Sequence, residues 1–425
     1  MYMYIEEIIM NAYLVVVLGL LVFEWLFSMI VEMLNIQHFS LTIPKEFEGV
    51  FDVEKYAKSQ SYLRTNTTFK EIKALIMLVV TILFVLLGGF RWMDGIAKTV
   101  SDFMILQGLA FAGILFLLSL LVDIPFGIYD TFVIEERFGF NKTTVKTFIL
   151  DFFKSLLLTA LIGAPIFALI LWFFGSFSLA WLWVWIALSI IQIFLMYIAP
   201  VVIMPLFNKF TPLEDGELKT AIETYAKAQN YGIKGIFTMD GSKRSTKSNA
   251  YFTGFGNTKR IAMFDTLIAK HTIPELIAVL AHEVGHCKLG HIIKSIIQSL
   301  ATSLVMFLLL SVFIHKEGLY QAFQLQGTPL YAGFFIFFFL YTPVSMITGI
   351  LSNIESRKHE YQADAFAAKT TRNPQDMISA LKKLSVDDLS NLTPHPMKVF
   401  MDYSHPPVLQ RIKALQKGKI GKSRK

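Results

Sequence analysis

The sequence of 425 residues contains a single cysteine, Cys287, so no intrachain disulfide can form and the fold does not depend on an oxidising compartment. Charged side chains are also scarce, at 17%, whereas apolar residues make up 54%. No internal repeat of about 20 to 50 residues is visible, which argues against a solenoid. A chain so poor in charge differs from an ordinary globular domain and indicates a membrane protein.

The sequence contains several long apolar stretches with few charged residues. Each of seven stretches is long enough to cross a hydrocarbon core of roughly 30 Å as a helix, which predicts a mostly α-helical, polytopic membrane protein. The stretches are 11–33, 74–90, 104–125, 155–174, 179–205, 295–314 and 331–351.

Lys and Arg residues gather in alternate loops between these stretches and after the last one. By the positive-inside rule, the N-terminus should lie outside and the C-terminus in the cytosol. The membrane would be the endoplasmic reticulum in a eukaryote or the inner (plasma) membrane in a bacterium. Such basic loops set topology and contact headgroups, so we expect membrane lipids as partners and no nucleic acid.

The apolar stretches divide the chain into four segments with different expected roles. The first holds five membrane helices, the second resembles a soluble domain, the third holds the last two membrane helices, and the fourth is cytosolic. Their bounds are 1–205, 206–294, 295–351 and 352–425.

The second segment contains "SNAYFTGFGNTKRIAMFDTL", where aromatic and β-branched residues flank a Gly-Asn turn. This pattern predicts a β-hairpin. Its edge strand either holds an extended peptide by main-chain pairing or is purely structural.

A helix that begins in the manner of a capping box, at Thr272, carries the motif His282-Glu283-Val284-Gly285-His286. The two histidines are i and i+4, share one helix face and can bind one metal ion, with Glu283 placed to take a proton from a metal-bound water. The missing side chain of Gly285 leaves room for substrate or for a neighbouring element. No breaker was identified before the sixth apolar stretch, so this helix could continue into the membrane.

A third ligand must come from elsewhere in the chain. His291 lies about 140° round an ideal helix from His286, so we expect it to be a helix-surface or interfacial residue and not a ligand. Glu360 and Asp364 are also i and i+4, and they form either a metal-binding face or a solvated acidic face. Arg357 either orients the Glu360 carboxylate or forms an ordinary helical ion pair.

Six blocks in this order resemble the CAAX prenyl endopeptidase type I family of integral-membrane zinc metalloproteases. They are "IYDTFVIEERFGFNKTT", "IAPVVIMPLFNKFTPLEDGEL", "SNAYFTGFGNTKRIAMFDTL", "AHEVGHCKLGH", "ESRKHEYQADAFA" and "YSHPPVLQRI".

The resemblance implies one zinc ion per chain, bound by His282, His286 and Glu360, with Glu283 as the catalytic base. Asp364 would be a second catalytic acid that shuttles a proton or orients the zinc ligands. The implied fold is a barrel-like chamber of seven tilted helices, capped on the cytosolic side by the zinc domain.

The resemblance also implies a substrate, a prenylated C-terminal peptide that loses its last three residues. Asn249, His405 and Arg411 would contact the substrate backbone or the tetrahedral oxyanion. Without the resemblance, His405 would be read as a turn histidine before two prolines.

Two alternatives to this function differ in class. A membrane quality-control zinc peptidase would share the motif and act on non-prenylated substrates, but such chains are shorter and have fewer spans. A transporter, or a scaffold with a structural zinc, would tend to show inverted repeats or four protein ligands, whereas this sequence offers three ligands and an open position.

Overall fold

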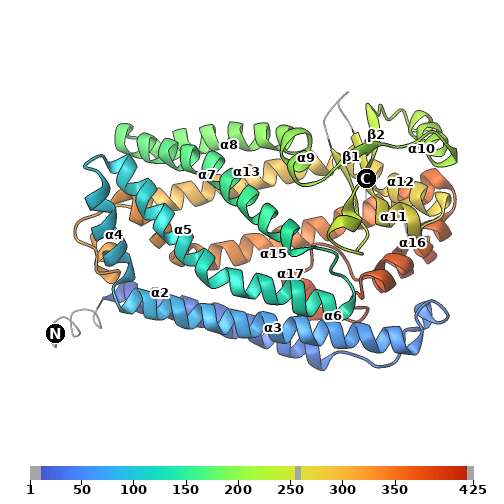
Figure 1. Cartoon of the computed structure of the whole chain (residues 1–425), viewed down its shortest axis with the longest axis horizontal. Helices are drawn as coiled ribbons and strands as arrows, with labels where there is room; N and C mark the ends of the chain where they lie inside the picture. Colours follow the sequence, from blue (N-terminus) through green and yellow to red (C-terminus); the bar gives the residue numbers. More distant parts are fainter. Residues whose placement is uncertain (1–10, 254–259, 419–425) are drawn as a thin grey trace.

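Helices dominate the computed structural model, which describes residues 11–253 and 260–418 (Figure 1). Six helices are long and apolar enough to cross a membrane, or seven if the bent pair α3–α4 counts as one span. The long helices are α2 (Ala12–Gln37), α3 (Val53–Leu86), α4 (Gly89–Val100), α5 (Met104–Tyr129), α7 (Val145–Ser176), α8 (Ala180–Ile198), α13 (His291–Phe313) and α15 (Leu330–Thr371).

The expected fold class is therefore confirmed, and backbone breakers explain where the spans bend. Gly88 adopts a left-handed φ of 77° between α3 and α4, which meet at 65°. Pro125 lies near the end of α5, which passes into a π-helical turn, η2 (Asp130–Glu135). A second π-helical turn, η3 (Ala199–Ile203), contains Pro200 and joins α8 to α9 (Met204–Phe207).

The shorter elements gather mainly at one end of the molecule (Figure 1). They are η1 (Lys45–Phe47), α6 (Glu136–Phe138), α10 (Glu217–Ala228), η4 (Gly241–Lys243), α11 (Asp265–Lys270), α12 (Ile273–Lys288), α14 (Glu317–Ala322), α16 (Pro374–Asp387), α17 (Pro396–Asp402) and α18 (Val408–Gln416).

A mixed four-stranded sheet replaces the simple hairpin expected from the sequence. Its strands are β1 (Phe210–Pro212), β2 (Gly235–Met239), β3 (Ala250–Thr253) and β4 (Arg260–Phe264), in the order β1-β2-β4-β3. The antiparallel pair β3–β4 is the predicted hairpin, and its Gly-Asn turn lies outside the described residues. The sheet is larger because β2 adds to β4 in parallel and β1 adds to β2.

The helix that carries the histidine motif does not continue into the membrane. It ends at Lys288, and α13 begins at His291 after Gly290, which has a left-handed φ of 70°. A glycine after a basic last turn is a common helix stop, and the uninterrupted apolar pattern had hidden it. The break changes where His291 lies.

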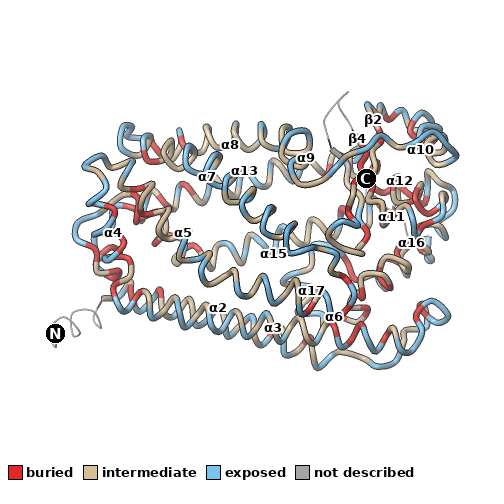
Figure 2. Tube along the Cα trace, viewed as in Figure 1, coloured by how far each residue is buried: buried red, intermediate tan, exposed pale blue. Residues whose placement is uncertain are grey.

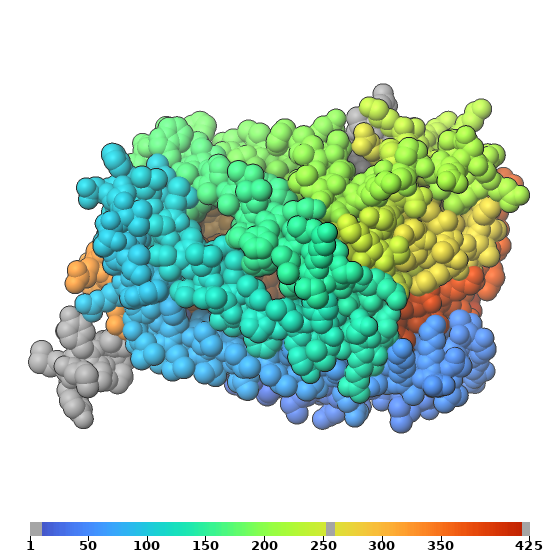
Figure 3. Space-filling view, in the orientation of Figure 1, coloured from blue at the N-terminus to red at the C-terminus, as the bar shows by residue number. Residues whose placement is uncertain are grey.

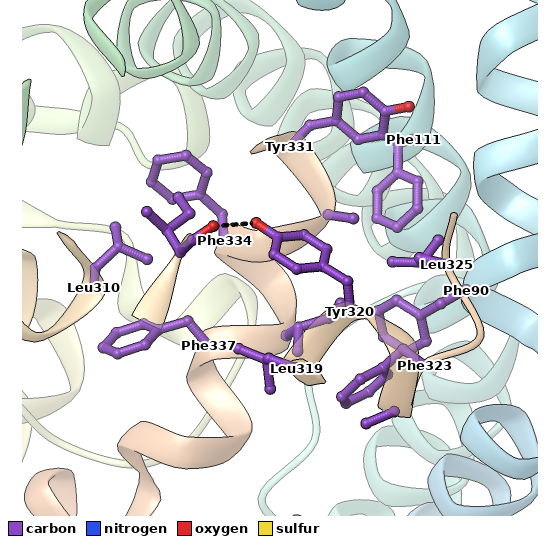
Figure 4. Close-up of a cluster of buried hydrophobic side chains, with 14 of the residues drawn as sticks. Phe90, Phe111, Leu310, Leu319, Tyr320, Phe323, Leu325, Tyr331, Phe334 and Phe337 are labelled. Carbon is purple, nitrogen blue, oxygen red and sulfur yellow. Dashed lines mark hydrogen bonds between the residues drawn. The ribbon is translucent and has the colours of Figure 1, made fainter. Parts of the chain in front are cut away.

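Buried residues are concentrated at the two ends of the molecule (Figure 2). At the end formed by α4, aromatic side chains of α4, α5, α14 and α15 pack together (Figure 4). Their polar atoms are satisfied, since the Tyr320 hydroxyl donates to the Ile314 carbonyl (2.6 Å) and the Tyr331 hydroxyl to buried Asp94 (2.6 Å). This cluster closes one end of the helix assembly.

The middle of the molecule is sparsely packed between these ends (Figure 2). Along α8 only Ala180 and Val184 are buried among the described residues, and along α7 only Leu171. Figure 3 shows openings among the atoms of α5 and α7, with atoms of the C-terminal half visible behind them. The helices thus surround a hollow interior.

Candidate metal centre

The metal centre is built on two helices that pack closely, α12 and α15. The start of α12 is fixed by a capping box, in which the Thr272 backbone N–H donates to Glu275 Oε2 (2.9 Å). Ser379 and Lys383 of α16 donate to the same carboxylate, at 2.6 and 2.8 Å. Burial alone would raise the pKa of Glu275, but these hydrogen bonds outweigh it and hold that pKa at about 2. The motif helix is therefore tied to α16 at its first turn.

Gly285 lets α12 approach α15. A Cβ placed there would lie 3.1 Å from Phe366 Cβ and 3.2 Å from Ala363 Cα. The missing side chain of Gly285 therefore leaves room for a neighbouring element, the helix α15. The close approach brings the motif histidines to the level of Glu360.

His282, His286 and Glu360 direct one ligand atom each towards a common point. The two Nε2 atoms are 3.1 Å apart, His282 Nε2 lies 3.4 Å from Glu360 Oε2, and His286 Nε2 lies 3.2 Å from Glu360 Oε1. Ligands about 2.0–2.2 Å from a tetrahedral zinc ion would be roughly 3.3–3.5 Å from one another. Glu360 Oε2 is also buried without a well-formed hydrogen bond. The three side chains therefore fit a tetrahedral ion.

A buried ion pair supports the ligands from behind. Asp364 Oδ1 lies 2.8 Å from His282 Nδ1, an arrangement that turns Nε2 towards the metal position. Arg411 of α18 donates to both Asp364 oxygens, at 2.8 and 2.6 Å, and lies 3.2 Å from Glu360 Oε2. With this geometry, Asp364 is placed to orient His282, one of the two expected roles of this residue.

Arg411, predicted to contact substrate, is buried beside the ligands and not at the cavity wall. It is 8% exposed, its guanidinium is engaged by carboxylates, and it does not line the cavity beside the metal position. These contacts favour a supporting role for Arg411 over the predicted contact with substrate.

Arg357 also differs from expectation. Its Nη1 donates to the carbonyls of Val399 and Tyr403, at 2.9 and 2.5 Å, so it anchors the chain around α17 and does not orient Glu360. Arg411, which is distant in sequence, lies beside Glu360 instead.

A cavity of ≈ 570 Å³ opens beside the metal position. Glu283, His286 and Glu360 line it, together with Tyr251 of β3 and His405. Burial raises the pKa of Glu283, which favours proton uptake by this carboxylate. The cavity thus combines an open metal position with a nearby proton acceptor.

Of the two remaining residues predicted to contact substrate, His405 lines the cavity and Asn249 does not. His405 is 63% exposed and places Nε2 3.3 Å from Glu360 Oε1, so it can reach a molecule in the cavity. Asn249 immediately precedes β3, is exposed, and accepts a hydrogen bond from the Ala250 N–H through Oδ1 (2.8 Å). It is not among the residues lining the cavity.

Sequence reasoning missed His291. The predicted helix surface position is wrong, because the break at Gly290 turns His291 back under α12, where it is 2% exposed and contacts His286. Gly290, as a possible helix stop, was the sequence signal that could have predicted the position of His291.

Two family models match nearly the whole chain. Residues 32–209 match the family described as "CAAX prenyl protease N-terminal, five membrane helices", and residues 212–419 match peptidase family M48. The chain is 38% identical to CAAX prenyl protease 1 of Saccharomyces cerevisiae over 88% of each chain. It is 34% identical to the CAAX prenyl protease 1 homolog of Arabidopsis thaliana over 94% of this chain and 96% of that protein.

A solved structure shares the fold. The crystal structure of S. mikatae Ste24p superimposes with a TM-score of 0.90 at 35% identity, covering 95% of this chain and 99% of that one. The arrangement of membrane helices and site-bearing helices is therefore common to both.

Proposed function

Because this chain belongs to the CAAX prenyl proteases of peptidase family M48, we propose that it is a zinc-dependent endopeptidase that removes the C-terminal tripeptide from prenylated CAAX proteins. The observation that carries the proposal is the convergence of His282, His286 and Glu360 at the wall of a cavity that Glu283 also lines. The resemblance found in the sequence is confirmed, as is the class of membrane metallopeptidase.

The chain's own residues supply most of the chemistry in this proposal. Zinc held here would lower the pKa of a bound water to about 7 and polarise the scissile carbonyl. Glu283 accepts the proton of the attacking water and passes it to the leaving amine. His405, exposed at the cavity wall, donates a hydrogen bond to the oxyanion that forms. Asp364 and Arg411 keep His282 and Glu360 in place.

The substrate peptide would lie along β3. This strand is at the end of the sheet order, and Ala250 and Tyr251 line the cavity. Pairing of an extended peptide with an outer strand uses main-chain atoms, so the enzyme can accept varied side chains. In this proposal Asn249, which immediately precedes β3, would contact the backbone of the same peptide. The prenyl group would occupy the hollow between the membrane helices.

The test is cleavage of a farnesylated and a non-farnesylated CAAX peptide by the detergent-purified protein, with and without a chelator. We expect release of the tripeptide from the farnesylated peptide, loss of activity with chelator, and recovery when Zn²⁺ is added back. Equal cleavage of both peptides would favour a quality-control peptidase. No cleavage of either by zinc-loaded protein would contradict the proposed function.

A further inference from the structure

His291 contacts the Nδ1 edge of the ligand His286 and also lines the cavity beside the metal position. Its Nδ1 is 3.1 Å from His286 Nδ1, and its Nε2 is 2.8 Å from Gln362 Oε1. The His291 side chain is buried, and the His359 ring lies parallel to it with centroids 4.0 Å apart. The imidazole is therefore fixed in plane and position by contacts on three sides.

The hydrogen bonds that link Gln362, His291 and His286 can run in only one direction. The Gln362 oxygen can only accept, so His291 Nε2 carries the proton and its Nδ1 is left as an acceptor. His286 must then donate through Nδ1–H, which leaves the lone pair of His286 Nε2 free and directed at the other two ligands. The neutral tautomer of each ring follows from its neighbour.

We propose that His291 is a positioning residue that accepts a hydrogen bond from His286 and holds that ligand in its metal-binding tautomer and orientation. His291 is not itself a ligand, because its Nδ1 faces the side of the His286 ring opposite to Nε2. The inference rests on the proposed zinc site, and it adds to that site a partner for the second histidine.

The two histidine ligands are supported by different chemistry. His282 Nδ1 is paired with the carboxylate of Asp364, whose charge is balanced by Arg411. His286 Nδ1 is paired with a neutral imidazole. Partners of this kind typically contribute a factor of about 10 to 100 to metal affinity. A neutral partner orients His286 without adding a further negative charge beside Glu360 and Glu283.

Gly290 makes this contact possible. Had α12 continued as one straight helix, His291 would lie about 140° round from His286, whereas the left-handed turn at Gly290 starts α13 with His291 beneath the ligand. The helix break is thus part of the metal centre.

The experiment compares variants that separate the hydrogen bond from the shape of the ring. In H291F the ring is kept and the acceptor is lost, while in H291N an amide oxygen takes the approximate place of Nδ1. H359F serves as the matched control, because it keeps the stacked ring and removes no contact with His286. Zinc affinity of each full-length protein is measured by competition with a chromogenic chelator, alongside thermal unfolding of the metal-free form.

We expect H291F to bind zinc about 10- to 100-fold more weakly, and H291N and H359F to stay within a few-fold of the wild type. Metal-free H291F should unfold near the wild-type temperature. Wild-type affinity in H291F, or equal losses in H291F and H291N, would overturn the proposal. A wild-type protein that binds zinc but cleaves no CAAX peptide would instead contradict the proposed function alone.

Substitutions of Gln362 provide a second test of the hydrogen-bond direction. Because this side chain is exposed, replacing it should not destabilise the fold. Q362E keeps an acceptor for His291 Nε2–H, whereas Q362L removes it and frees His291 to adopt the other tautomer. We expect a few-fold loss of zinc affinity in Q362L and none in Q362E. The reverse order would contradict the assigned hydrogen-bond direction.

Discussion

Besides the ligand Glu360, two carboxylates adjoin His282, and their surroundings give them different roles. Asp364 accepts hydrogen bonds from Arg411 and contacts His282 Nδ1, so its oxygens are occupied. Glu283 lines the cavity, and burial raises the pKa of its carboxyl. Because only Glu283 faces the space where substrate and water meet, it is the residue whose loss should affect proton transfer most directly.

We expect Glu283→Gln to reduce cleavage of a farnesylated CAAX peptide by about 10²- to 10⁴-fold, since Gln is similar in size but cannot accept the proton. Zinc content and thermal unfolding should remain near wild-type values, because Glu283 is not one of the three converging ligands. The measurement is initial rate together with zinc content of the same preparation. Substantial activity in the zinc-loaded variant would remove Glu283 from the mechanism.

At the scale of elements, the site depends on how α12 is held against α15 and α16. His282 and His286 are on α12 and Glu360 is on α15, so the spacing of these two helices determines whether three ligands converge. Gly285 sets that spacing in the middle of α12, and Glu275 fixes its first turn.

Gly285→Leu should force α12 and α15 apart, because even a Cβ there would lie 3.2 Å from the backbone of Ala363. Overpacking of this kind typically costs about 1–3 kcal/mol, and here it also separates Glu360 from the histidines. We therefore expect zinc affinity and cleavage to fall together, along with the unfolding temperature. The matched control is Gly163→Ala in α7, where no atom lies within 4 Å of the added Cβ. Wild-type zinc affinity in Gly285→Leu would show that the helix spacing is not critical.

Glu275 makes the stability of α12 depend on pH. Its folded-state pKa of about 2 is below the ordinary 4.5, so the stabilisation is present above pH 4.5 and is lost as pH falls towards 2. A difference of this size corresponds to up to about 3 kcal/mol at neutral pH. Glu275→Gln should thus lower the unfolding temperature at pH 7 and have a smaller effect at pH 3. Unfolding is followed in the presence of chelator, so that loss of metal does not contribute, and an equal effect at both pH values would contradict the assignment.

For the whole molecule, local sequence pattern predicted the membrane helices and half of the metal site. Hydropathy indicated every span, and spacing placed His282 and His286 on one face. The contacts that depend on packing between distant segments were not visible. Arg357 was assigned to Glu360 because it is near in sequence, whereas α18 brings Arg411 there. His291 was set aside by an angle that holds only for an unbroken helix. The strands β1 and β2 are separated in sequence by α10, so no tight turn marked them as a pair.

Orientation in the membrane remains a prediction from charge, and the single cysteine makes it directly measurable. In a Cys287→Ser background, Asp102→Cys places a thiol between α4 and α5, and Glu54→Cys places one in the first turn of α3, within the basic sequence segment that follows the first span. Both positions are exposed in the structure. Since Lys and Arg are abundant in the segment of Glu54 and sparse in that of Asp102, a membrane-impermeant maleimide applied from outside should label only Asp102→Cys, and Glu54→Cys should react after permeabilisation. The opposite labelling pattern would contradict the predicted orientation and would place the metal centre on the outer face of the membrane.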